Sequence, residues 1–149
     1  MGATATIAEF IVNTNAAQYP AGSTEKAIKV IADTYAVILA GVSSEVAEPL
    51  HKYQESMRES GASPILGAGR TASPEMAALI NGTYGHSLDY DDVLSMMPAH
   101  PSAVIVAALL ASMDGNTVSG KDFIEAYIMG VEVGGKLGVG MPNDHYQRG

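Results

Sequence analysis

The stretch NGTYGHSLDYDDVLSMMPAHPSA, residues 81–103, decides how the chain is organised. It holds two of the four histidines, His86 and His100, and three aspartates, Asp89, Asp91 and Asp92. No other segment of the sequence places so many groups able to exchange protons between two apolar segments. The residues on either side are therefore interpreted as the scaffold that positions this stretch.

Apolar residues on both sides recur at the spacing of helices. Ser73-Pro74-Glu75 has the features of a helix start, because a capping hydroxyl precedes a proline and an acid. Ser23 or Thr24, the pair Ser43 and Ser44, and Ser119 are the other predicted caps, and Gly61 is the predicted end of the third helix. We expect helices over about residues 4–13, 24–41, 45–60, 74–84, 102–113 and 120–137.

Residues 62–71 lack helical rhythm and predict a short β-hairpin or an extended loop. Arg70 in this segment is interpreted as a partner in a surface salt bridge. The helix over 102–113 is apolar nearly all round, which predicts burial on all sides. The last helix holds four glycines, which predict close helix–helix approach with Glu132 facing a tight interior: Gly130, Gly134, Gly135 and Gly138. The fold class is therefore all-α, with one short β-hairpin near residues 63–71.

Composition excludes several classes of function. The net charge of −8 opposes binding to nucleic acid or to anionic membranes, which need clustered lysine and arginine. The absence of cysteine excludes disulfides and thiolate chemistry. There is no signal-peptide pattern, and the longest apolar run is too short to span a membrane, so we expect a soluble cytoplasmic protein. The low charged share of 16% also predicts self-association.

Three interpretations of the polar cluster remain open from residue chemistry. A histidine just before a helix could exchange protons near neutral pH, oriented by a neighbouring carboxylate. The aspartates could instead cap helices and bind loop amides. A divalent ion could also bind, although the spacing excludes an EF-hand because Leu94 and His100 occupy its glycine and glutamate positions. The first two interpretations have equal support, and the metal interpretation has less.

The motif NGTYGHSLDYDDV, followed by HPSAVIVAALLA, resembles the MmgE/PrpD family. The likeness extends to ILGAGRTASPEMAALING, DFIEAYIMGVEVGGKLG and HYQRG, and so covers nearly the whole chain. The resemblance implies that residues 1–149 are the N-terminal part of a helical domain, with the family's α+β lid domain absent. It also implies a homodimer, no cofactor and no metal.

The resemblance assigns roles by position in the motif. Asp89 and His100 match the family's catalytic aspartate and histidine, and we expect His86 and Arg148 to bind substrate. Asp91 and Asp92 match positions of the motif for which we expect a structural role. Val93 stands where relatives often carry threonine, which removes a hydroxyl. A second family histidine, the substrate-binding lysines and the lid would lie beyond Gly149.

The implied function is lyase chemistry on a small di- or tricarboxylic acid, similar to 2-methylcitrate dehydratase, with only part of the active site on this chain. The alternative is a catalytically incomplete helical module or truncated fragment, completed in one variant by a partner chain. The resemblance leaves dehydration, decarboxylation and epimerisation all open.

Overall fold

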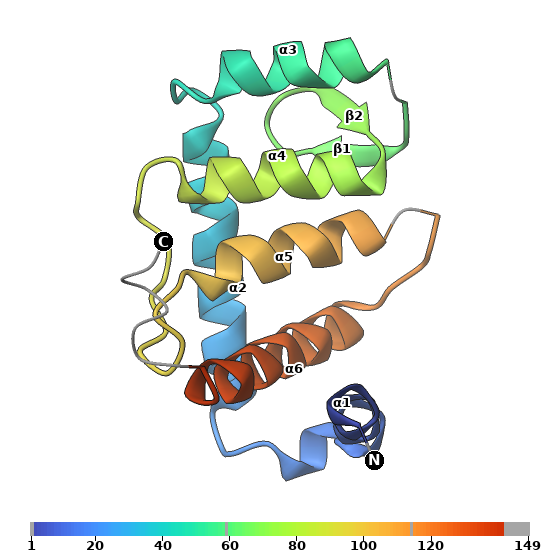
Figure 1. Ribbon diagram of the computed structural model, residues 1–149, viewed down its shortest axis with the longest axis vertical. Coiled ribbons are helices and arrows are strands. Elements are labelled where there is room, and N and C mark those ends of the chain that lie inside the picture. The colour runs from blue at the N-terminus through green and yellow to red at the C-terminus, as the bar shows by residue number, and fades with distance from the viewer. Residues whose placement is uncertain (1, 59, 114, 142–149) are drawn as a thin grey trace.

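The computed structural model describes residues 2–58, 60–113 and 115–141. These residues form helices and one two-stranded hairpin, which confirms the predicted fold class (Figure 1). The elements in chain order are α1 (Ala3–Asn13), a one-turn 3-10 helix (Ala16–Gln18), α2 (Ser23–Gly41), α3 (Ala47–Met57), β1 (Ser63–Ile65), β2 (Arg70–Ala72), α4 (Pro74–His86), α5 (Pro101–Ser112) and α6 (Gly120–Val139).

Helix α2 runs across a row formed by α4, α5 and α6 and contacts all three (Figure 1). Near the end of α2, Gly41 lies against the backbone of Tyr84 in α4. A Cβ atom at Gly41 would lie only 2.7 Å from the carbonyl carbon of Tyr84. The crossing of α2 and α4 therefore depends on a residue without a side chain.

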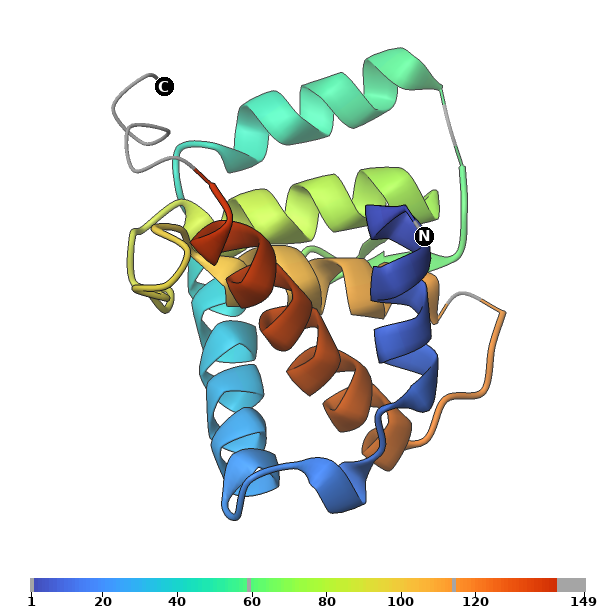
Figure 2. The same ribbon diagram turned by 60° about the horizontal axis from the view of Figure 1, so that its bottom comes forward.

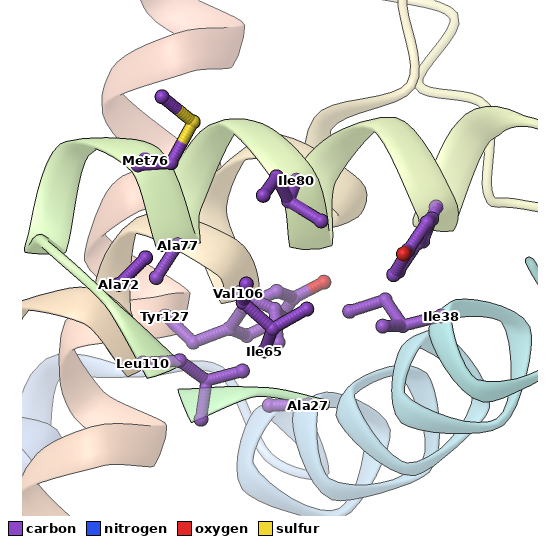
Figure 3. Close-up of a cluster of buried hydrophobic side chains, with 11 residues drawn as sticks. Ala27, Ile38, Ile65, Ala72, Met76, Ala77, Ile80, Val106, Leu110 and Tyr127 are labelled. Carbon is purple, nitrogen blue, oxygen red and sulfur yellow. The ribbon is translucent and has the colours of Figure 1, made fainter. Parts of the chain in front are cut away.

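The hydrophobic core lies between α2, the row of helices and the hairpin. Ile38, Ile80 and Val106 come from α2, α4 and α5 and are completely buried. Figure 3 shows them converging with Ile65 of β1 and Tyr127 of α6. Burial of a large apolar side chain contributes about 1.5–3 kcal/mol. These contacts hold the ends of α4 and α5, and with them the polar loop, in place.

A buried amide attaches the hairpin to α4. The side chain of Asn81 accepts a hydrogen bond from the Leu66 amide at 2.9 Å and donates one to the Pro64 carbonyl at 2.9 Å. Asn81 is fully buried, so these bonds satisfy groups that would otherwise be costly to bury. The strands are antiparallel, with the pairs Ser63↔Ala72, Pro64↔Thr71 and Ile65↔Arg70.

The predicted caps are confirmed at two helices. Ser73 accepts a hydrogen bond from the Met76 amide, and Ser119 accepts one from the Asp122 amide. At α2 the prediction is wrong, because Gly22 is the N-cap and no side chain caps the helix.

The predicted bounds of the third helix, residues 45–60, are also wrong. The amide and hydroxyl of Ser44 both donate to the Gly41 carbonyl, so the serines close α2 rather than start α3. At the other end, Arg58 takes a left-handed conformation with φ 52° and stops α3 ahead of Gly61.

Two expectations about burial need correction. Val104 of α5 is 68% exposed, so this apolar helix is not buried on all sides. Glu132 pairs with Lys136 at 2.7 Å on the surface of α6 instead of facing the interior. The glycines of α6 do allow other parts of the chain to approach this helix closely, but only one of these parts is a helix. Gly130 faces Ile105 of α5, whereas Gly134 and Gly138 face Met97 of the loop before α5.

Helix α1 lies beside α6 and buries none of its residues (Figure 2). Its contact with α6 includes Phe10, whose ring centre is 5.3 Å from the Lys136 ammonium nitrogen. Within the described ranges, none of the helices combines the length and apolar character required to cross a membrane.

Candidate active site

The two histidines of the polar stretch lie at the facing ends of adjacent helices. His86 is the last residue of α4, and His100 directly precedes α5. Asp89 has a φ of 56°, a left-handed conformation that aspartate tolerates better than most residues. Its amide donates to the His86 carbonyl at 3.0 Å. This turn reverses the chain after α4 and directs Asp91 back toward His86.

The rest of the loop is held by its own backbone and by α6. The amide of Leu94 donates to the Ala99 carbonyl at 3.1 Å, which closes a tight loop. Met97, at the tip of this loop, packs against Gly138, where a Cβ atom would lie 2.8 Å from the Met97 Cα. The glycines of α6 thus create the space that the loop occupies.

Asp92 is a structural residue, as expected. Its two carboxylate oxygens accept hydrogen bonds from the Ser102 amide at 3.1 Å and the Ser102 hydroxyl at 2.7 Å. The hydroxyls of Ser102 and Tyr127 lie 2.7 Å apart. Burial raises the pKa of Tyr127, an effect that the bond with Ser102 reduces and the charge of Asp92 increases. Asp92 therefore caps α5 and links it to α6.

Asp91 lies between the two histidines, and its carboxylate is completely buried. Both of its oxygens are 3.1 Å from His86 Nδ1. Its Oδ1 is also 3.4 Å from His100 Nδ1. The two imidazole rings are themselves close, with centroids 4.6 Å apart. One buried carboxylate therefore lies between the two histidines and orients His86 through hydrogen bonds.

Asp89 is the outermost member of this cluster. Its Oδ1 is 3.8 Å from His100 Nε2, and its side chain is 80% exposed. His86, Asp89, Asp91 and His100 each offer one donor atom, and these four atoms lie within 4.8 Å of one another. The structure therefore brings together three of the predicted site residues, His86, Asp89 and His100. It adds Asp91, for which the sequence indicated only a structural role.

The cluster borders an apolar groove between α4 and α5. The groove has a volume of about 730 Å³. His86 and His100 are at its edge, while Leu79, Ala103 and Val104 supply apolar walls. A ligand bound against the histidines would therefore meet polar atoms on one side and hydrocarbon on the other.

No lysine or arginine of the described segments lines this groove. Arg148, the predicted substrate-binding cation, lies outside the described residues. Arg70 forms the predicted surface salt bridge, with 3.0 Å between its Nη1 and Glu55 Oε1. The described part of the site thus offers groups for proton exchange but no fixed positive charge for an anionic ligand.

Sequence reasoning missed two long-range contacts within the scaffold. Asn81 was part of the quoted stretch, but nothing in its neighbours indicated that it would bind the hairpin. His51 stands among charged residues in the sequence, a setting typical of a surface histidine, yet its Nε2 lies 2.8 Å from the hydroxyl of buried Tyr84. Burial raises the pKa of Tyr84, and the positive charge of Arg70 offsets part of this increase. Contacts across 33 residues leave no local signal in a sequence.

Comparison with known proteins agrees with the motif. The MmgE/PrpD N-terminal domain matches residues 5–148. A cis-aconitate decarboxylase-like protein, oryM of Aspergillus oryzae, is 27% identical over 145 residues, which are 93% of this chain and 30% of that protein. A cis-aconitate decarboxylase of Aspergillus terreus is 29% identical, over 92% of this chain and 29% of that enzyme.

The cis-aconitate decarboxylase of Mus musculus is 30% identical over 78% of this chain and 25% of that enzyme. The chain thus spans at most 30% of the length of these relatives. The match to the domain covers almost every residue, from the first helix to beyond the last. The chain belongs to the MmgE/PrpD family.

Proposed function

We infer that this chain contributes the histidine and aspartate part of a lyase active site that acts on a small di- or tricarboxylic acid. The observation that carries this proposal is the buried Asp91 carboxylate between His86 and His100, at the edge of an open groove. Decarboxylation of cis-aconitate is the preferred reaction, because several relatives bear that name. Dehydration of 2-methylcitrate is the second candidate, from the resemblance of the motif.

Both reactions need a proton donor or acceptor beside a carbon that carries a carboxylate. Loss of CO₂ breaks the bond between the carboxylate carbon and its neighbour and leaves the electron pair on that neighbour. A protonated histidine can return a proton to that carbon. In dehydration, a neutral histidine removes a proton from carbon while hydroxide leaves and is protonated to water. His100 supplies this group in either case.

The geometry supports different roles for the residues of the cluster. The buried Asp91 bonds to Nδ1 of His86 and lies 3.4 Å from Nδ1 of His100, so Nε2 of His100 is the ring nitrogen that remains for the substrate. Asp89 is exposed beside that nitrogen, at 3.8 Å, and can bind substrate or assist its protonation. His86 is 56% exposed at the groove and is assigned to substrate binding.

The lack of lysine or arginine along the groove within the described ranges supports a second proposal. A substrate with two or three carboxylates needs cationic groups to offset its charge. We therefore propose that the 149-residue chain by itself is a catalytically incomplete helical module, completed by further family segments or by a partner chain. Homodimer formation stays a prediction from the resemblance, and a cytoplasmic location stays a prediction from the sequence.

The test compares wild type and His100→Ala in the complete gene product, with cis-aconitate and 2-methylcitrate as substrates. Release of CO₂ from cis-aconitate, or formation of a carbon–carbon double bond from 2-methylcitrate, identifies the reaction. We expect His100→Ala to lower kcat/KM about 100-fold to 10,000-fold, the usual contribution of a positioned acid or base. His51→Gln is the matched histidine control and should retain activity, since His51 does not line the groove.

Full activity of His100→Ala would remove His100 from the mechanism. The purified 149-residue chain should show no turnover with either acid, and measurable turnover would refute the proposal that it is incomplete. Mass spectrometry of co-purified proteins tests whether a partner chain completes the site.

A further inference from the structure

We propose that the cluster of His86, Asp89, Asp91 and His100 is a binding site for a divalent transition-metal ion such as Zn²⁺. The donor atoms of these four residues lie within 4.8 Å of one another. They are two imidazole nitrogens and two carboxylate oxygens, a set that suits Zn²⁺ and its first-row neighbours.

The two distances that Asp91 makes inside the cluster are close to those around a tetrahedral ion. Zinc lies about 2.0–2.2 Å from nitrogen and oxygen ligands, so adjacent ligand atoms of a tetrahedral site are about 3.4 Å apart. Asp91 Oδ1 is 3.1 Å from His86 Nδ1 and 3.4 Å from His100 Nδ1. An ion placed against these three atoms needs only small adjustments of the side chains.

One atom of the cluster is not explained by hydrogen bonding. His100 Nδ1 is buried, and within the described ranges it has no hydrogen-bond partner. It lies 3.4 Å from Asp91 Oδ1 but does not form a hydrogen bond with it. A buried nitrogen without a partner costs free energy. An ion shared with Asp91 and His86 would satisfy it, whereas the hydrogen bonds of Asp91 satisfy only His86.

The elements that carry the donors also favour a defined site. His86 is fixed at the end of α4, His100 at the start of α5, and Asp91 is completely buried. Asp89 is 80% exposed and can rotate toward the ion at little cost. Three ligands are therefore held by the fold, and the fourth is adjustable and open to solvent.

Metal binding and the proposed proton exchange exclude each other, because an ion bound to Nδ1 of His100 would prevent that ring from alternating between neutral imidazole and imidazolium. An ion in the cluster would therefore inhibit the complete enzyme. The binding site itself rests only on the geometry of the four residues. It can be tested without any enzymatic assay, so failure of the proposed function would leave it standing.

The test is titration of the chain with Zn²⁺ by calorimetry, with Co²⁺ absorption as the report of coordination geometry. We expect saturable binding of one ion per chain and the intense visible bands of tetrahedral Co²⁺. His86→Gln, Asp91→Asn and His100→Gln should each weaken binding at least about tenfold. His86→Gln is the safest of these variants, since its side chain is 56% exposed and its loss leaves the core intact.

Two control variants keep all four donors. Asp33→Asn removes an exposed carboxylate from α2, and His51→Gln removes a histidine outside the cluster. Both should bind Zn²⁺ as wild type does, with circular dichroism used to verify folding of every variant. Absence of saturable binding by wild type would overturn the proposal. So would binding that survives His86→Gln and His100→Gln unchanged, because the ion would then be held elsewhere.

Discussion

The adjacent residues Asp91 and Asp92 have different partners because Asp89, which precedes them, has a left-handed backbone conformation. Asp89 turns the backbone at φ 56°, after which Asp91 faces the histidines and Asp92 faces the start of α5. The sequence correctly indicated that histidines and aspartates would gather and that Asp92 would be structural. It could not indicate that Asp91 lies closer to His100 than Asp89 does, since that depends on the direction of one turn.

Tyr127 makes the link between α5 and α6 sensitive to alkaline pH. Burial raises its pKa above the ordinary value of 10.0, so the folded state retains the phenolic proton more strongly than the unfolded state. Its contribution to stability is complete below pH 10.0 and is lost as the pH rises toward the folded-state pKa. Burial also raises the pKa values of Tyr35 and Tyr84, so these two tyrosines likewise lower stability when the pH rises.

We therefore expect the free energy of unfolding, measured in urea, to fall as the pH rises above about 10. Tyr127→Phe should make this fall shallower, although it lowers stability at neutral pH by removing the hydroxyl contact with Ser102. Tyr53→Phe is the control, since Tyr53 is largely exposed and should leave the slope unchanged. An identical slope in wild type and Tyr127→Phe would contradict the assignment.

At the scale of elements, local patterns predicted helices well where a cap contacts its own first turn. Ser73 and Ser119 do this, and both helix starts were found. Ser44 looks the same in sequence, but it bonds backward to Gly41 and closes α2. Distinguishing the two cases requires the tertiary contact that fixes where α2 ends, which no local pattern contains.

Gly41 is the residue on which the crossing of α2 and α4 depends. In Gly41→Ala the new methyl group would collide with the backbone of Tyr84, which cannot move aside as a flexible side chain can. We expect a loss of about 1–3 kcal/mol in the free energy of unfolding, the usual cost of overpacking. Chemical denaturation measures it.

Gly120→Ala is the matched control, because no atom lies within 4 Å of a Cβ built at Gly120, the first residue of α6. That change should be neutral or slightly stabilising, since alanine reduces the freedom of the unfolded chain. Equal stabilities of the two variants would show that α2 and α4 can separate without cost.

At the scale of the whole molecule, the groove beside the histidines is an apolar surface that the described part of the chain leaves uncovered. The sequence showed an apolar surplus and predicted that part of the surface would be covered. It could not locate that surface, because a helix apolar on every side gives no indication of which side stays open. The structure locates it on α5 and α4, where Val104 and Leu79 are exposed.

This groove should drive self-association of the isolated chain. Substitutions at two equally exposed valines, one inside the groove and one outside it, test whether association depends on the groove. Val104 lies in the groove and is 68% exposed, whereas Val93 is 69% exposed outside it. We expect Val104→Glu to lower the apparent mass in concentration-dependent light scattering, because it places a charge in the apolar surface. Val93→Glu adds the same charge at the same exposure and should leave association unchanged. Equal effects of both variants would attribute association to net charge, and a strictly monomeric wild type at high concentration would exclude the groove as a contact between copies.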